Sequence, residues 1–273
     1  MDEAARTTRI VALSGATARD EDDVVAREEP LEIQVQGASL AVLMRTPGED
    51  LDLALGFLTT EGIIARREDV VSMRHCSSVK DEDAEENILR VVLRDGVDVP
   101  LALLRRNTFA SSSCGVCGKA TIEATLVDAP PIVTSCTIPS DVLFALPARL
   151  REGQRTFDAT GGLHAAGLFD LHGERLALAE DVGRHNAVDK VIGKALSAAI
   201  ALDTTCLLVS GRVSFEIVQK ALVARIPILA GISAPTSLAV ALGTRAGVTL
   251  AGFLRDRTVN LYAHPARVVT GTP

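Results

Sequence analysis

The chain has 273 residues, of which 47% are hydrophobic and 23% are charged, a composition typical of a folded globular protein with one large domain or two ordinary ones. Its formal net charge of −7 argues against a nucleic-acid-binding protein with a broad basic face. The five cysteines are scattered along the chain, which favours a reducing, cytoplasmic location over a disulfide framework. We expect neither a signal peptide nor a membrane span, because the chain begins with acidic residues and no apolar run approaches about 20 residues.

Residues 1–29 are rich in Asp and Glu and predict an acidic tail with one short apolar stretch at 10–13. A small α+β domain is expected over residues 30–135, ending in a cysteine-containing loop and a linker with two prolines. Its expected elements are strands at 31–35, 40–44, 70–76 and 88–93, and a helix that opens at 47–50 and ends at Gly62. The acidic stretch at 81–86 is interpreted as a solvated hairpin turn.

Cys114 and Cys117 form a CxxC motif within the sequence Ser-Ser-Ser-Cys-Gly-Val-Cys-Gly-Lys at 111–119. Thiols at this spacing bind a soft metal, cycle between dithiol and disulfide, or carry sulfur as a persulfide. Structural zinc needs four ligands and no second CxxC or HxxxH is present, so zinc requires a composite or intermolecular site. A thioredoxin-like role fits poorly, because that motif ends an early strand of a small βαβ domain. A Ser- and Gly-rich loop with Lys119 beside a helix start favours reactive thiolates, but the motif alone does not prove sulfur transfer.

From Thr160 onward strands and helices alternate, which predicts a three-layer α/β domain over residues 136–273, with a mostly parallel sheet covered on both faces. Strands are expected at 163–171, 175–179, 205–209, 227–230 and 248–253, and helices at 140–150, 186–202, 214–224 and 235–245.

Polar turns follow three of these strands, at 180–190, 210–216 and 231–237. Because ligands of parallel α/β sheets bind at the carboxyl edge, we expect these turns to gather there. The stretch 180–190, with Arg184 and His185 among several polar residue types, favours a ligand site over a solvated helix start. For the other two turns, a plain helix cap explains the residues equally well.

Two further segments carry candidate chemistry. His164 alone is best explained as a core histidine. Its segment invites comparison with the His-x-Glu of zinc nucleoside deaminases, but Ala166 replaces the Glu and no later PCxxC is present, so deaminase chemistry is close to excluded. At 252–258, two arginines around an Asp could clamp a phosphate while Phe253 stacks on a base. Without other information an ordinary surface hairpin is the better explanation.

Taken together, four motifs resemble the formate dehydrogenase accessory protein family (FdhD/NarQ). They are Ser-Ser-Cys-Gly-Val-Cys-Gly at 112–118, Thr-Gly-Gly-x-His-Ala-Ala at 160–166, Glu-Asp-Val-Gly-Arg-His-Asn-Ala-x-Asp-Lys at 180–190 and Ser-Gly-Arg-x-Ser-x-Glu at 210–216. Gly-Phe-Leu at 56–58 and Glu-Gly-Ile-Ile at 61–64 fit as well, so the resemblance covers about residues 30–264.

The resemblance implies a sulfurtransferase that takes sulfur from a cysteine desulfurase and passes it to the molybdenum bis(molybdopterin guanine dinucleotide) cofactor of formate dehydrogenase. It implies that Cys114 is the persulfide carrier and Cys117 its helper. It also implies a C-terminal domain similar to the cytidine deaminase fold, a homodimer, and no permanently bound metal. A chaperone that holds the cofactor without sulfur chemistry is the alternative.

The same resemblance replaces the surface-hairpin explanation with cofactor contact. The expected cofactor-binding residues are Phe253, Leu254, Arg255, Asp256, Arg257 and Thr258, with His164, Arg184 and His185 added from the polar segments described above.

Overall fold

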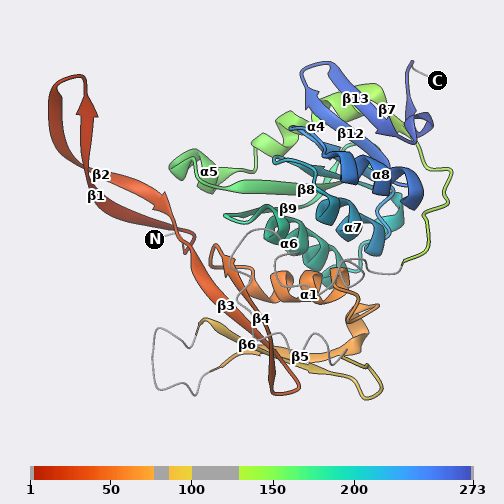
Figure 1. Ribbon diagram of the computed structural model, residues 1–273, viewed down its shortest axis with the longest axis horizontal. Coiled ribbons are helices and arrows are strands. Elements are labelled where there is room, and N and C mark those ends of the chain that lie inside the picture. The colour runs from red at the N-terminus through yellow and green to blue at the C-terminus, as the bar shows by residue number, and fades with distance from the viewer. Residues whose placement is uncertain (1–2, 77–85, 100–128, 272–273) are drawn as a thin grey trace.

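The structure is a computed structural model that describes residues 3–76, 86–99 and 129–271 (Figure 1). Its N-terminal sheet has the strand order β4-β3-β6-β5, formed by β3 (Glu29–Val35), β4 (Ala38–Arg45), β5 (Val70–His75) and β6 (Ile88–Leu93). Alternate residues of β3, Leu31, Ile33 and Val35, are buried as their polar–apolar alternation predicts. Helix α1 (Asp50–Thr60) packs its apolar residues into the same core, and the short turn η1 (Arg67–Asp69) precedes β5. The expected strands and helix of this region are therefore confirmed, although most of the acidic stretch at 81–86 lies outside the described residues.

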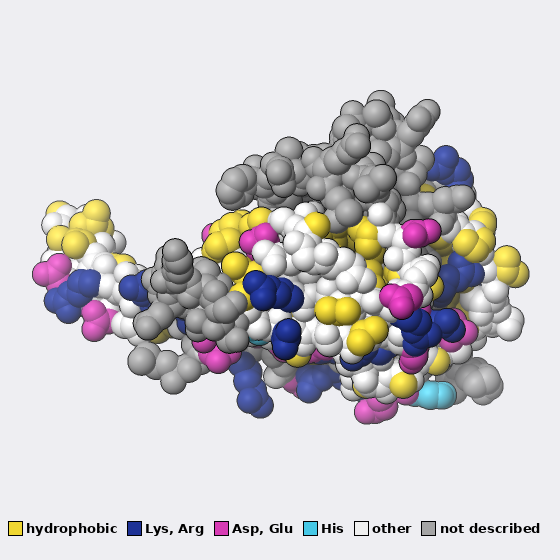
Figure 2. Space-filling model, turned by 90° about the horizontal axis from the view of Figure 1, so that it is seen from below, with side chains coloured by type: hydrophobic (Ala, Val, Ile, Leu, Met, Phe, Trp, Pro, Cys, Tyr) yellow, Lys and Arg dark blue, Asp and Glu magenta, His cyan; other side chains and the backbone are white. Residues whose placement is uncertain are grey.

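The prediction of an acidic tail at residues 1–29 is wrong. Strands β1 (Ala5–Ser14) and β2 (Thr17–Ala26) pair along their whole length as an antiparallel hairpin that projects from the body (Figures 1 and 2). Pairing places the acidic strand beside the arginines of β1, and Arg9 lies 3.5 Å from Asp22. The apolar stretch expected in the tail lies in β1, where Val11 and Leu13 are largely exposed. The acidic composition predicted a tail because composition alone does not show this cross-strand pairing of opposite charges.

The C-terminal sheet has six strands in the order β13-β12-β11-β10-β8-β9. They are β8 (His164–Asp170), β9 (Arg175–Asp181), β10 (Thr205–Val209), β11 (Ile228–Gly231), β12 (Thr249–Arg255) and β13 (Thr258–Ala263). The sheet is mixed rather than mostly parallel, because only β10–β11 and β11–β12 are parallel pairs. Strands β8 and β9, and likewise β12 and β13, are joined by short turns, and a short turn permits only antiparallel pairing. This part of the prediction is corrected.

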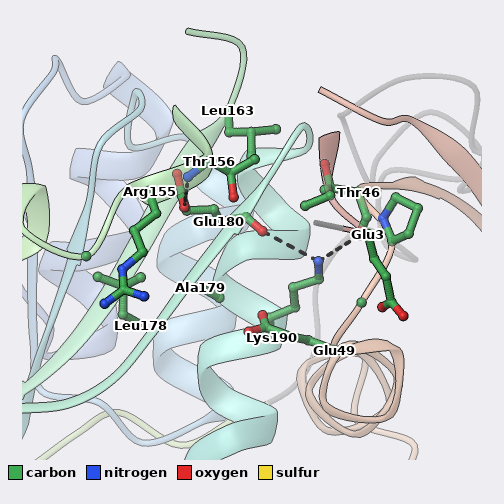
Figure 3. Close-up of a pocket in the computed structure, with 14 residues that line it drawn as sticks. Glu3, Thr46, Glu49, Arg155, Thr156, Leu163, Leu178, Ala179, Glu180 and Lys190 are labelled. Carbon is green, nitrogen blue, oxygen red and sulfur yellow. Dashed lines mark hydrogen bonds between the residues drawn. The ribbon is translucent and has the colours of Figure 1, made fainter. Parts of the chain in front are cut away.

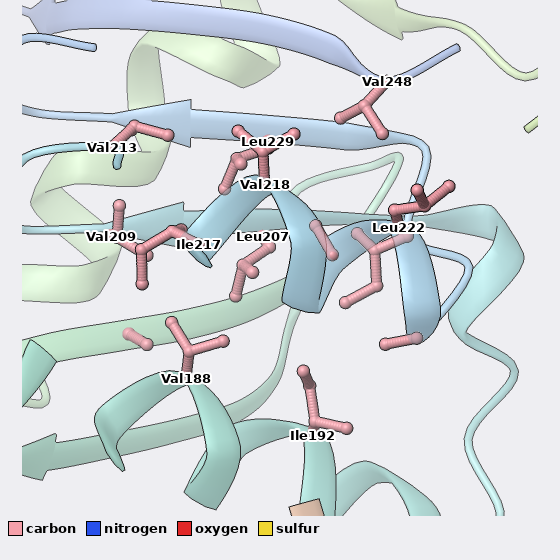
Figure 4. Close-up of a cluster of buried hydrophobic side chains, with 14 of the residues drawn as sticks. Val188, Ile192, Leu207, Val209, Val213, Ile217, Val218, Leu222, Leu229 and Val248 are labelled. Atoms are coloured by element: carbon pink, nitrogen blue, oxygen red, sulfur yellow. The ribbon is translucent and has the colours of Figure 1, made fainter. Parts of the chain in front are cut away.

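Helices cover both faces of this sheet and give three layers (Figure 1). One face packs against α6 (Arg184–Ser197), α7 (Phe215–Val223) and α8 (Ser237–Ala246) through the apolar cluster in Figure 4. The other face packs against α4 (Ser140–Arg151) through a second cluster that includes Leu143, Leu146 and Leu150. Full burial of one such aliphatic side chain contributes about 1.5–3 kcal/mol, so the layers are held mainly by these clusters.

Shorter elements complete the chain. The helix α5 (Arg155–Thr160), which the sequence did not predict, precedes β8. The strands β7 (Ile138–Pro139) and β14 (Val268–Val269) form a small parallel pair, and the turns η3 (Leu202–Thr204) and η4 (Pro265–Arg267) precede β10 and β14. None of the helices in the described ranges is long and apolar enough to cross a membrane.

The N-terminal sheet is joined to the C-terminal layers by a close crossing of α1 and α6. A Cβ atom added at Gly56 would lie 1.8 Å from the Asp189 carbonyl oxygen, and one added at Gly193 would lie 1.9 Å from the Asp52 carbonyl oxygen. Only glycine fits at either position, since any Cβ would meet backbone atoms of the other helix. The position of α6, which carries two of the candidate site residues, therefore depends on α1.

Candidate functional site

The polar turns gather at one edge of the C-terminal sheet, as the sequence predicts. The carboxyl ends of β10, β11 and β12 lie there beside the amino end of β8. Backbone hydrogen bonds join neighbouring turns: Ser210 donates to the Ala165 carbonyl oxygen at 2.9 Å, and Phe253 donates to the Ser233 carbonyl oxygen at 3.1 Å. His164 and Phe253 thus lie on the same edge.

Most of the polar residues at 180–190 hold the two parts of the chain together instead of facing a ligand. Asp181 is fully buried, and its carboxylate accepts hydrogen bonds from the Thr46 and Gly183 amides at 3.1 and 2.7 Å. It also pairs with buried Lys190 at 2.8 Å, and Asn186 donates both to Asp181 and to the Met44 carbonyl oxygen.

A second buried ion pair extends this joint. Asp189 accepts from the Thr60 hydroxyl at 2.8 Å and from Lys220, whose Nζ lies 2.8 and 2.9 Å from its carboxylate oxygens. Burial raises the pKa of Asp189, and the Lys220 charge opposes that rise. Glu180, in turn, accepts from the backbone amides of Thr156 and Phe157 at the start of α5. Of the residues at 180–190 that were expected to form a site, Arg184 and His185 are left to meet a ligand.

Arg184 lies beside His164 at the sheet edge. A Cβ atom added at Gly211 would lie 3.3 Å from His164 Nδ1 and 3.6 Å from Arg184 Cβ, so both side chains border this glycine. The pKa of His164 is held below its usual value, first by burial and then by the positive charges of Arg184, His185 and Arg212, while Asp181 opposes them. His164 is therefore mainly neutral at pH 7.

His185 is almost completely buried and its ring is fixed on one side. Its Nε2 lies 3.3 Å from the Ser214 hydroxyl oxygen and 3.6 Å from a Glu216 carboxylate oxygen. The Ser214 hydroxyl donates to Glu216 at 2.6 Å, so both neighbours present acceptors to Nε2. Within the described ranges, His185 Nδ1 and Arg184 Nε are buried without hydrogen-bond partners.

The expected cofactor segment at the end of β12 is irregular. Phe253 and Asp256 have φ angles of 53° and 52°, in the left-handed region that bulky residues such as Phe rarely adopt, and the β12–β13 register shifts between Gly252 and Arg255. Backbone strain of this kind is often found at binding sites. The Arg255 guanidinium lies 5.7 Å from the Phe253 ring centroid, and both side chains face solvent at least in part.

The remaining residues of this segment divide into buried and exposed ones. Leu254 is fully buried in the core against α4, so its side chain does not reach a surface ligand. Asp256 and Thr258 are exposed, and Arg257 lies 5.8 Å from the Phe144 ring centroid and 3.5 Å from Asp141. Phe253 and Arg255 are thus the residues of this segment whose geometry best suits a stacked, charged ligand.

Cys114 and Cys117 lie outside the described residues. Among the described cysteines, Cys76 and Cys206 are buried and Cys136 is partly buried. Burial raises the pKa of the Cys206 thiol to about 12, so this thiol stays protonated at neutral pH. Across the described ranges, no group of three His, Cys, Asp or Glu side chains lies close enough to hold a metal ion.

A cavity of about 280 Å³ is lined by the N-terminal segment, residues 46–49, the start of α5 and part of β9 (Figure 3). Glu3, Glu49, Arg155 and Lys190 line it, but none of the predicted site residues that the structure describes does. Lys190 Nζ already donates to the Thr46 carbonyl oxygen at 2.9 Å, as Figure 3 shows, and pairs with Asp181. This lysine therefore links two parts of the chain and is not available to a ligand.

The FdhD/NarQ family model matches residues 26–269. The chain belongs to the FdhD/NarQ family. It is 51% identical over 267 residues to the sulfur carrier protein FdhD of Mycolicibacterium paratuberculosis, covering 96% of this chain and 97% of that protein. It is also 44% identical over 268 residues to the sulfur carrier protein FdhD of Sulfurisphaera tokodaii, covering 97% of this chain and 99% of that protein.

A crystal structure shares the fold of this FdhD/NarQ chain. A candidate formate dehydrogenase accessory protein from Desulfotalea psychrophila superposes with a TM-score of 0.75 at 22% identity, covering 97% of this chain and all of that one. The mixed α/β architecture is thus shared across the full length.

Three residues of the motif at 210–216 acquire individual roles only in the structure of this FdhD/NarQ family member. Arg212 adds positive charge around His164, and Ser214 and Glu216 hold the His185 ring. From sequence their polar turn is explained equally well as a helix cap. The sequence feature that could have identified these residues is their position in a turn after a strand, because such turns are expected to meet at one edge of the sheet.

Proposed function

We propose that this protein is a sulfur carrier that moves persulfide sulfur from a cysteine desulfurase to the molybdenum bis(molybdopterin guanine dinucleotide) cofactor required by formate dehydrogenase. The observation that carries the proposal is the near-full-length similarity to proteins named sulfur carrier protein FdhD. The CxxC motif supports it, because paired thiols in a Ser- and Gly-rich sequence suit sulfane-sulfur chemistry. A cytoplasmic location and a homodimer are part of the proposal.

Cys114 is the proposed carrier and Cys117 its helper. The Cys114 thiolate attacks the terminal sulfur of the donor persulfide, the donor S–S bond breaks, and the donor cysteine leaves as a thiolate. Cys117 can then attack the inner sulfur of Cys114 and release hydrosulfide, which leaves a Cys114–Cys117 disulfide that needs two electrons from a dithiol to return. Cys206 is a poor alternative carrier, since its buried thiol has a pKa of about 12.

The cofactor is the cargo in this proposal. Phe253 offers an aromatic face for the guanine base, and Arg255 beside it offers a cation for a phosphate. The strained backbone at Phe253 supports a binding role for this segment. The expected likeness of the C-terminal layers to the cytidine deaminase fold also belongs to the proposal, with Ala166 in place of the catalytic Glu.

The test is persulfide loading followed by intact-mass spectrometry. After incubation with a desulfurase and cysteine, the wild-type protein should gain about 32 Da, the mass of one sulfur atom. Cys114→Ala should gain none and should lose support of formate dehydrogenase activity, while Cys136→Ala, the control, should load normally. Loading of Cys114→Ala at the wild-type level would contradict the assignment. A cofactor chaperone without sulfur chemistry would bind guanine nucleotides but gain no sulfur mass.

A further inference from the structure

Helix α6 begins with two basic residues at the end where a helix favours anions. Arg184 and His185 are its first two residues, its first turn contains no acidic residue, and no side chain caps the helix at Gly183. Because the amino end of a helix carries partial positive charge, basic side chains there are electrostatically unfavourable unless an anion lies nearby. The sequence of this turn is the opposite of what helix stability alone favours.

The same two residues contain buried polar atoms without partners in the described part of the chain. These atoms are Arg184 Nε and His185 Nδ1, and His185 is only 6% exposed. A guanidinium has donors and no acceptor, so the group that satisfies Arg184 Nε must be a hydrogen-bond acceptor. Burying such a donor unpaired is unfavourable, which points to a ligand at this position.

The charges around this turn favour an anion as that ligand. His185 Nε2 faces Ser214 and Glu216, which both present acceptors, so Nδ1 is the ring nitrogen that is left open to a ligand. The two nearby carboxylates are already engaged, Glu216 with His185 and Asp181 with Lys190.

Two more side chains add to the positive surroundings. Arg212 is exposed beside this turn, and His164 borders Arg184 across Gly211. The lowered pKa of His164 reflects its burial and the excess of positive charge from Arg184, His185 and Arg212, which Asp181 only partly offsets. An anion bound here would compensate that excess.

We propose that Arg184 and His185, with His164 and Arg212, bind a phosphate-type oxyanion at the amino end of α6. The oxyanion chemistry follows from the donors alone, whereas its assignment to the diphosphate of the cofactor rests on the proposed function. His164 on β8 and Phe253 on β12 are separated by three strand spacings, roughly 14 Å. That separation suits an extended dinucleotide whose base stacks on Phe253 and whose phosphate reaches Arg184.

The test is isothermal titration calorimetry of the full chain with sodium diphosphate, GDP and guanosine. The wild-type protein should bind diphosphate and GDP, and Arg184→Gln and His185→Gln should each weaken both at least tenfold while leaving guanosine affinity unchanged. The control is Arg245→Gln, because Arg245 is an exposed arginine near the end of α8, at the opposite edge of the sheet. It should match the wild type in all three titrations.

A measurement on the unmodified protein covers the case in which a variant does not fold. In ¹⁵N-labelled wild-type protein, the Nδ1 resonance of His185 should shift on addition of diphosphate, and that of His172 on the β8–β9 turn should not. An unmoved His185 resonance, or variants that bind diphosphate as tightly as the wild type, would overturn the inference.

The titrations also separate this inference from the proposed function. Phe253→Ala should abolish guanosine binding and weaken GDP, while diphosphate binding persists. If diphosphate binds in an Arg184-dependent way but Phe253→Ala leaves GDP affinity unchanged, the oxyanion site stands as a free phosphate site and the cofactor assignment fails. If Cys114 gains sulfur but neither diphosphate nor GDP binds, the oxyanion site is refuted and sulfur transfer remains.

Discussion

Replacing Gly56 with alanine tests whether α1 and α6 hold the two parts of the protein in one arrangement. The new methyl group would lie 1.8 Å from the Asp189 carbonyl oxygen, against a backbone that has no rotamer to change. To reach the ordinary contact distance of 3.4 Å, the two helices would have to separate by about 1.6 Å.

The expected loss of stability has two parts and one offset. Overpacking of this kind costs about 1–3 kcal/mol. Separation would also stretch the 2.8 Å hydrogen bond between Thr60 and Asp189 across the same crossing, and leaving those buried groups unpaired costs about 1–3 kcal/mol. Alanine gains about 1 kcal/mol over glycine in a helix, which opposes both. The free energy of unfolding should therefore fall by about 3 kcal/mol.

The assay is thermal and urea unfolding followed by far-ultraviolet circular dichroism. For a chain of this size, each kcal/mol lowers Tm by about 2–4 °C, so Tm should fall by about 6–12 °C. Gly243→Ala is the matched control, since its Cβ would meet only ordinary contacts, the nearest being Leu250 Cβ at 3.5 Å, and should leave Tm unchanged or slightly raised. Equal Tm values for Gly56→Ala and the wild type would refute the close crossing.

Three further results are expected. Lys220→Met should lower the free energy of unfolding by about 3–5 kcal/mol in urea titrations, because it leaves the buried Asp189 carboxylate without its cation. The double variant Lys220→Met with Asp189→Leu should recover most of that loss. A single variant as stable as the wild type would contradict the buried ion pair. Iodoacetamide at pH 8 should alkylate Cys206 in urea but not in the folded protein. Peptide mass mapping locates the label. Rapid alkylation of Cys206 in the native protein would contradict the burial of this thiol. The pKa of His164 is depressed in the free protein, and a bound anion would raise it. Diphosphate affinity measured by calorimetry should therefore rise as pH falls from 7.5 toward the depressed pKa. His164→Gln should make the affinity less dependent on pH.

The depressed pKa of His164 also sets a direction for stability. The folded protein binds fewer protons at this residue than the unfolded chain does, so its contribution is favourable above the unfolded value of about 6.5. That contribution is lost gradually as pH falls through the window between the unfolded and folded pKa values. His164→Gln should therefore reduce the loss of Tm between pH 7 and pH 5 in thermal melts. A pH dependence equal to that of the wild type would contradict the burial of the neutral ring.

Local sequence determined most of the secondary structure and the location of the polar turns. The alternation of Leu31, Ile33 and Val35 predicts a half-buried strand, and β3 has that burial pattern. The CxxC motif and the family resemblance were likewise identified from the sequence alone, and the family match confirms that resemblance. Such features depend on neighbours a few positions apart, so a single sequence suffices.

Only the tertiary structure decided which polar residues are free to bind a ligand. In the sequence, Asp181 and Asp189 are as plausible site residues as their neighbours. In the structure they accept hydrogen bonds from Thr46 and Thr60, which lie 135 and 129 positions away in the chain. The hairpin at the acidic N-terminus and the mixed C-terminal sheet were not predicted for the same reason. Strand pairing is decided by contacts between segments and not by the sequence within one segment. Burial and long-range hydrogen bonding, which local sequence does not encode, distinguish the polar residues that hold this fold together from those that remain as candidate binding residues.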